Sequence, residues 1–171
     1  MNSQYIQKNV AFVIGALRTA VLVENNIELS RLALLMPLLM DDRIVSVVND
    51  SALEHSFESL ISTNRIPLAN YNERYLSSLP YLYQAVAMLL DVEVVSMKNG
   101  VLTKLNTNIL SDMCASCQCQ SLTNMCKAMQ KLLKMTEGKS IVKMYELLNV
   151  ELLNSILIRY IFGLLQKTNV V

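Results

Sequence analysis

The spacing of hydrophobic residues along this chain is helical over most of its length and changes character in one place. Between residues 93 and 105 the pattern becomes short, β-branched and partly alternating on either side of Lys98-Asn99-Gly100. An Asn-Gly pair accepts positive φ at both positions of a two-residue type I′ turn. The pattern therefore predicts a mainly α fold, in which a helical domain carries one short β-hairpin and has a winged-helix-like core.

Capping and breaking residues divide the helical part of the chain into predicted elements. Ser30 is the expected N-cap of a helix that Pro37 kinks or splits. Pro80 suits the first turn of a helix that begins there, and Gly138 with Ser140 predicts a stop followed by a new start. The predicted helices cover residues 4–24, 31–42, 44–48, 52–63, 68–77, 81–92, 106–135 as one or two helices, 141–150 and 151–167.

No internal repeat and no low-complexity linker divides the 171 residues. One helical domain over residues 1–171, with a hairpin wing near 93–105, is the expected organisation.

The composition predicts that part of the apolar surface is covered by another chain. Hydrophobic residues make up 53% of the sequence and charged residues only 17%, so little polar surface remains for a monomer. The segment from Leu32 to Met40 is apolar on almost every side. Such a helix is buried all round, or packs one face on its own core and another on a partner. The predicted partner-binding residues are Leu32, Leu35, Met36 and Leu39.

The apolar run VAFVIGALRTAVLV, residues 10–23, raises the question of a membrane or targeting segment. Arg18 interrupts it, and it falls short of the roughly twenty apolar residues that span a bilayer. The preceding residues also lack a signal-peptide pattern. A buried helix in a cytoplasmic protein without membrane contact is expected.

Catalytic signatures are weak in this sequence. His55 is the only histidine, which removes most acid-base and triad mechanisms at neutral pH. Glu137-Gly138-Lys139-Ser140 resembles the end of a phosphate loop, but Leu133 stands where such a loop needs glycine. We expect no enzyme activity and no cofactor.

Four cysteines within thirteen residues raise the question of a zinc site. They are Cys114, Cys117, Cys119 and Cys126, in the spacing C-x2-C-x-C-x6-C. Most of these thiols fall on the apolar stripe of a predicted helix, where a free cysteine behaves as a small hydrophobe. We therefore expect reduced thiols and no metal, with zinc as the alternative.

Lysines on the wing and late in the chain support a second functional hypothesis. The candidate DNA contacts are Lys98, Lys104, Lys127, Lys131 and Lys134. They fit a stand-alone winged-helix DNA-binding protein, because lysines bind phosphate. The net charge of only +1 and the few Arg or Asn residues on a recognition helix disfavour sequence readout.

The order of several segments, between about residues 9 and 150, resembles one known family. They are N-V-A-F-V-I-G-A-L, L-L-M-P-L-L-M-D-D-R-I, L-S-S-L-P-Y-L-Y-Q-A-V-A-M-L-L-D-V-E-V-V followed by N-G-V-L, and A-M-Q-K-L-L-K-M-T-E-G-K-S-I-V-K-M-Y-E-L-L-N-V. Together they resemble the middle component of bacterial three-component ABC-ATPase systems, which includes the small accessory subunit of Lamassu-type defence. The chain departs from that pattern at residues 130–135, at Asn149-Val150 and in the apolar extension after Val150.

The resemblance implies a non-catalytic subunit that bridges an SMC-like ABC ATPase and an effector nuclease in defence against phage or plasmids. Its implied partners are these two proteins, with DNA contacted mainly through the complex.

Overall fold

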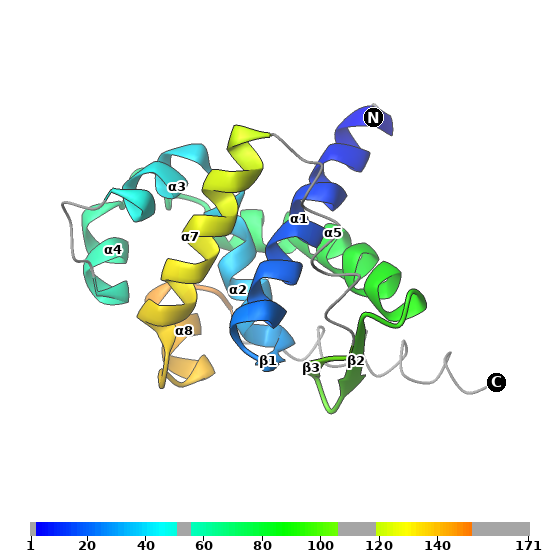
Figure 1. Cartoon of the computed structure of the whole chain (residues 1–171). Helices are drawn as coiled ribbons and strands as arrows, with labels where there is room; N and C mark the ends of the chain where they lie inside the picture. The colour runs from blue at the N-terminus through cyan, green and yellow to red at the C-terminus, as the bar shows by residue number, and fades with distance from the viewer. Residues whose placement is uncertain (1–2, 51–55, 106–118, 152–171) are drawn as a thin grey trace.

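The computed structural model describes residues 3–50, 56–105 and 119–151, and shows a bundle of helices with a small sheet at one edge (Figure 1). The helices are α1 (Ser3–Val23), α2 (Leu29–Leu39), α3 (Asp42–Asn49), α4 (Phe57–Thr63), α5 (Tyr71–Asp91), α7 (Gln120–Thr136) and α8 (Ile141–Leu147), and the strands are β1 (Asn26–Glu28), β2 (Val95–Lys98) and β3 (Val101–Lys104). The predicted mainly α class with a short hairpin is confirmed.

The sheet contains a third strand that the sequence pattern did not reveal. Its order is β1-β3-β2, with both pairs antiparallel. Ile27 on β1 lies opposite Leu102 on β3, and both side chains are buried. The succession α1, β1, α2, α5, β2, β3 is that of a winged-helix domain, with α3 and α4 standing between α2 and α5.

The hairpin turn forms where the sequence predicted it. Asn99 and Gly100 have φ of 53° and 77°, as a type I′ turn requires. The Gly100 carbonyl also accepts the Leu29 N–H at 2.9 Å, which joins the turn to the start of α2. The wing is thereby attached to the helical core at its tip as well as along β3.

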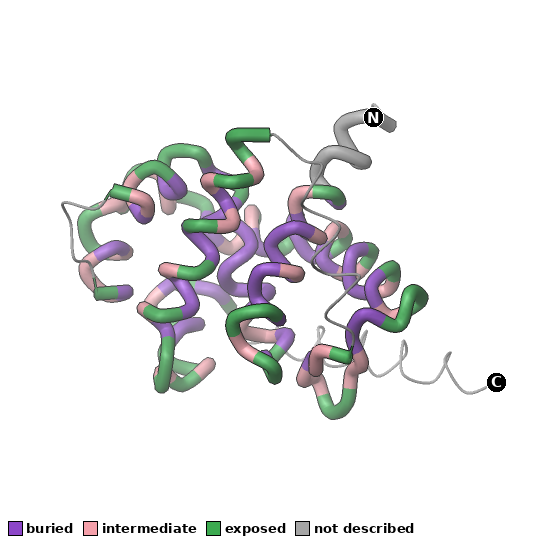
Figure 2. Tube along the Cα trace, viewed as in Figure 1, coloured by how far each residue is buried: buried purple, intermediate pink, exposed green. Residues whose placement is uncertain are grey.

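Helix α2 forms the centre of the core. Every residue from Leu32 to Leu39 is buried, and Figure 2 shows this helix buried among its neighbours. It packs against α1, α3, α5, α7, α8 and β1. A helix that is apolar all round needs such an enclosed position.

The predicted boundaries at Ser30 and Pro80 were wrong. Ser30 lies inside α2, because β1 runs directly into the helix with Glu28 at the N-cap. Of the two alternatives at Pro37, a kink or a split, the split is excluded, because α2 continues through the proline. The segments predicted as separate helices around Pro80 form one helix, α5, with the exposed Pro80 inside it. A proline ring removes only one hydrogen bond, here to the Leu76 carbonyl, and packing on either side maintains the helix.

The predicted stop and start between α7 and α8 is confirmed. Gly138 follows the C-cap residue Glu137 with φ of 69°, and the Ser140 hydroxyl accepts the Lys143 N–H at 3.2 Å. Arg31 of α2 stabilises the same end of α7 by donating to the Leu133 carbonyl at 2.7 Å.

Candidate protein-interaction surface

The most distinctive surface of the described chain is the solvent side of α5. We call it the outer face of α5, and it consists of Glu73, Leu76, Ser77, Pro80, Gln84, Ala87, Met88 and Asp91. These positions recur at three and four residues, so they lie on one side of the helix. All are exposed except the half-buried Ala87, with Leu76 at 38% and Met88 at 47% exposure.

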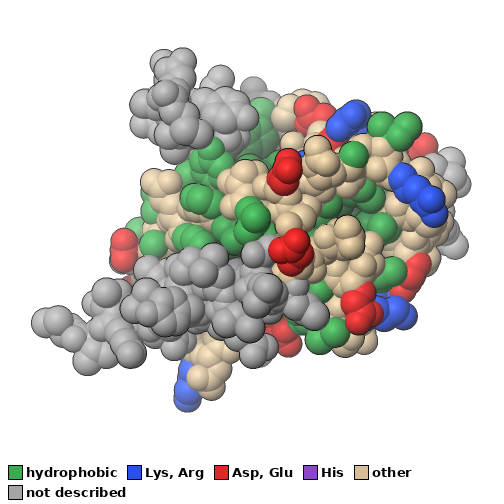
Figure 3. Space-filling model, turned by 180° about the vertical axis from the view of Figure 1, so that it is seen from behind, with side chains coloured by type: hydrophobic (Ala, Val, Ile, Leu, Met, Phe, Trp, Pro, Cys, Tyr) green, Lys and Arg blue, Asp and Glu red, His purple; other side chains and the backbone are tan. Residues whose placement is uncertain are grey.

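The opposite side of α5 holds the helix in place and so orients the outer face. Tyr75, Leu79, Leu82, Val86 and Leu89 point into the core. This side packs against α1 and α2, which leaves α5 on the face of the molecule seen from behind in Figure 3. Hydrophobic side chains are visible across the middle of that face.

The charge of the outer face is confined to its two ends. Glu73 and Asp91 are acidic, and the six positions between them are uncharged. The only cation of α5 is Arg74, which is turned toward α2 and the segment that precedes α5. Its guanidinium donates to the Pro67 and Pro37 carbonyls and lies 3.3 Å from Asp41. The outer face therefore offers no positive charge to a phosphate.

Asp41 explains why Arg74 is held there. Its buried carboxylate caps α3 by accepting the Arg43 N–H at 3.0 Å, and it also pairs with the Arg43 guanidinium at 2.8 Å. These hydrogen bonds, together with the charge of Arg74, lower the pKa of Asp41. Asp41 is thus a buried N-cap residue of α3 that also holds Arg74 in place.

The predicted partner-binding residues are not on the surface. Leu32 and Leu35 have 0% exposure, Met36 has 1% and Leu39 has 4%. The two alternatives for this helix were full burial and a shared interface, and the structure has full burial. The assignment of these four side chains to a partner surface is corrected accordingly, because neighbouring elements of the same chain cover them.

The predicted DNA-contacting lysines fall on two separate elements. Lys98 is exposed and Lys104 half-buried on the hairpin, while Lys127 and Lys134 are exposed on α7. Lys131 donates to the Asn49 carbonyl at 3.0 Å, so it stabilises the end of α3. Helix α7 packs on α1, α2, α3 and α4, and the hairpin on β1, α1 and α5, so the lysines do not form one continuous patch.

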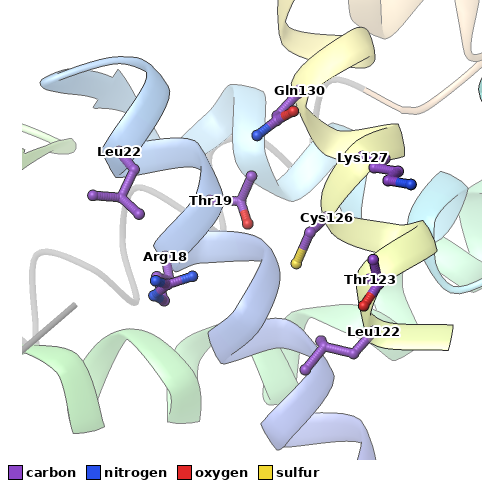
Figure 4. A pocket seen from close by; sticks show the side chains of 8 residues that line it. All are labelled: Arg18, Thr19, Leu22, Leu122, Thr123, Cys126, Lys127 and Gln130. Atoms are coloured by element: carbon purple, nitrogen blue, oxygen red, sulfur yellow. The ribbon is translucent and has the colours of Figure 1, made fainter. Parts of the chain in front are cut away.

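A shallow cleft of about 270 Å³ lies between α1 and α7 (Figure 4). Thr19 and Cys126 face the space between the helices, while Lys127 points away from α1. The helices approach closely because Gly15 has no side chain: a Cβ there would lie 2.6 Å from the Leu122 Cδ1 atom. The Gly15 carbonyl accepts from Thr19 and from the Cys126 thiol. The cleft is a by-product of this packing.

The residues weighed for metal or nucleotide chemistry are placed as follows. Cys119 is the exposed N-cap residue of α7, and Cys126 is half-buried against α1. Cys114, Cys117 and His55 lie outside the described residues. Within the described ranges no cluster of three or more His, Cys, Asp or Glu side chains could hold a metal ion. The absence of zinc remains a prediction.

The segment that resembled a phosphate loop has a structural role. Lys139 pairs with Glu58 of α4 at 2.7 Å, and Lys143 of α8 lies 3.8 Å from the same carboxylate. These cations lower the pKa of Glu58. The loop between α7 and α8 is thereby attached to α4.

Several tyrosines, whose rings could in principle stack on bases, belong to the core or its edge. The Tyr75 and Tyr145 hydroxyls lie 3.0 Å apart, and their rings meet edge to face. Tyr71 is also buried and donates to the Leu34 carbonyl. Burial raises the pKa of Tyr75 and Tyr71 above the usual range, and that of Tyr83 to about 12. The buried rings of Tyr71, Tyr75 and Tyr145 are not available to stack on nucleic acid.

Comparison with protein-family models, curated proteins and solved structures gave no match for this chain. A search of the described helices for a bilayer-spanning segment found none with the required length and hydropathy. The functional conclusion therefore depends on the surface itself and on the sequence resemblance.

Proposed function

We propose that the chain is a non-catalytic accessory subunit of a bacterial defence complex against phage or plasmids. In that complex it bridges an SMC-like ABC ATPase and an effector nuclease. The partners are drawn from the sequence resemblance. The observation that supports a role in assembly is the exposed, largely uncharged outer face of α5.

Helix α5 occupies the position that a recognition helix has in a winged-helix domain, directly before the wing. A recognition helix reads base edges with Arg, Lys, Asn or Gln and reaches phosphates with cations. The outer face of α5 offers Gln84 alone from that set, and ends in Glu73 and Asp91. Exposed Leu76 and Met88 on an uncharged helical face are better suited to a protein partner.

The buried and paired charged groups support a non-catalytic role, because their hydrogen bonds and ion pairs stabilise the fold. Asp41 caps α3, Glu58 pairs with Lys139, and Arg31 bonds to Glu24 and to the end of α7. In the proposal, the chain contributes surfaces and its partners contribute the chemistry.

A stand-alone winged-helix DNA-binding protein is the second candidate. The order of the elements and the exposed Lys98 beside the turn favour it. Contacts through the wing alone would be directed to phosphate and would weaken steeply with salt.

Co-purification tests the two candidates against each other. The full chain is expressed together with the products of the genes that neighbour its own, among which the proposal expects an ATPase and a nuclease. We expect a ternary complex that survives replacement of Lys98 and Lys104 by Ala but is lost in Leu76→Lys/Met88→Lys. Ile66→Lys/Val142→Lys is the matched control, since these side chains are 85% and 54% exposed on other elements. A lone chain that binds DNA and recovers no partner would favour the second candidate.

A further inference from the structure

The last described residue, Glu151, lies beside the N-terminal end of the outer face of α5. The Glu151 N–H donates to the Asn72 side-chain oxygen at 3.3 Å, in the first turn of α5. The chain then continues for residues 152–171, LLNSILIRYIFGLLQKTNVV. This segment is therefore tethered beside the acidic N-terminal end of an exposed helix face whose middle is uncharged. A tether this short gives an effective concentration in the millimolar range or above.

The sequence of the segment matches the outer face in hydrophobicity and length. With helical spacing, Leu153, Leu157, Tyr160 and Leu164 share one side, and Lys167 continues it. At 1.5 Å per residue the sixteen residues 152–167 span about 24 Å, and the 21 residues of α5 span about 31 Å. A helix of that length covers most of the outer face.

The two surfaces are also complementary in charge at the end of α5 that carries Asp91. The outer face is acidic at both ends, and residues 152–171 contain Arg159 and Lys167 but no acidic residue. Measured from the Glu151–Asn72 contact, a parallel helix carries Lys167 about 24 Å along, and Asp91 lies about 28 Å along α5. A lysine side chain covers that difference.

We propose that residues 152–167 dock along the outer face of α5 in the free subunit, and that the partner displaces them on assembly. The second half of this statement rests on the proposed function, and the first half does not. The segment protects an apolar face until a partner replaces it. Because the segment and the partner bind the same face, the segment also lowers the apparent affinity of the partner.

Site-specific photo-crosslinking of the full chain, without any partner, tests the docking. Met88→p-benzoylphenylalanine places the probe on the outer face, and the same substitution at Val142 on α8 is the control. We expect monomeric adducts from position 88 that map to residues 152–167, and none of these from position 142. Adducts to a second copy, or to other parts of the chain, would overturn the proposal.

Variants of the segment give a second test, made with the same probe at Met88. Leu157→Asp/Leu164→Asp, with the probe at Met88, should lower the adduct yield about tenfold through loss of apolar contact. Lys167→Asp should lower it by about threefold, and Asp91→Lys in the same chain should restore it. Unchanged yields in both sets would overturn the docking.

The regulatory step is then measured separately. Leu157→Asp/Leu164→Asp should bind the ATPase subunit about tenfold more tightly than the wild type, because the internal competitor is weakened. Intramolecular adducts without any ATPase binding would leave the docking standing and would refute the proposed function. If the segment docks but the wild type and the variant bind the ATPase with equal affinity, only the displacement step is refuted, and the docking stands.

Discussion

Replacing Leu35 by Ala should destabilise the folded chain without acting on a partner directly. Leu35 lies on α2 with 0% of its surface exposed, and helices surround it on every side. A buried Leu→Ala change costs about 2–5 kcal/mol, and a site enclosed by rigid neighbours falls in the upper part of that range because it collapses poorly. At about 4 kcal/mol, the melting temperature of a domain of this size falls by roughly 8–16 °C.

Urea unfolding followed by circular dichroism at 222 nm measures this effect. The midpoint should fall while the slope of free energy against urea stays constant. Leu76→Ala is the matched control on the outer face of α5, and should change stability by no more than about 0.5 kcal/mol. If Leu35→Ala unfolds like the wild type and yet fails to assemble, α2 is an interface and the burial argument is wrong.

Three further predictions follow from single contacts. Gly15→Leu should cost about 1–3 kcal/mol in urea unfolding, because a side chain there collides with Leu122 across the α1–α7 contact; unchanged stability would mean that the two helices separate freely. Gly138→Ala should cost about 1–2 kcal/mol from its φ of 69° alone, since nothing lies within 4 Å of the added methyl, and a neutral result would contradict the C-terminal cap of α7. The Asp41 carboxylate, whose pKa the Arg43 hydrogen bond lowers, should stabilise the fold fully above the unfolded pKa of about 3.9 and lose that contribution as the pH falls toward the folded value. The stability gap between wild type and Asp41→Asn should therefore narrow below pH 4, and a gap that widens there would reverse the assignment.

The features predicted correctly from sequence are those fixed by local chemistry. The Asn99-Gly100 turn and the Gly138 stop depend on backbone conformations that neighbouring residues allow, so the sequence shows them directly. Strand β1 was not predicted, because three residues are too few to show the alternation of apolar and polar positions that is typical of a strand. Its pairing with β3, more than seventy positions later, makes it a strand.

The candidate surface was missed for a related reason. Breaking the helix at Pro80 divided the outer face of α5 between two short predicted helices, so its uncharged length did not appear. Reading residues 71–91 as one helix would have shown exposed positions from Glu73 to Asp91 without a cation. The apolar character of α2 was evident from sequence, but only tertiary packing decides whether such a helix is core or interface.

The affinity of the full chain for the ATPase subunit, measured by isothermal titration for the wild type and two variants, tests the assembly role of the outer face most directly. Leu76→Lys/Met88→Lys should weaken binding about a hundredfold or more, since both apolar contacts are lost and two charges are buried or displaced. Ile66→Lys/Val142→Lys should bind within about threefold of the wild type, because exposed positions away from the contact contribute little. Equal affinity for the wild type and the outer-face variant, with both folded by circular dichroism, would contradict the account.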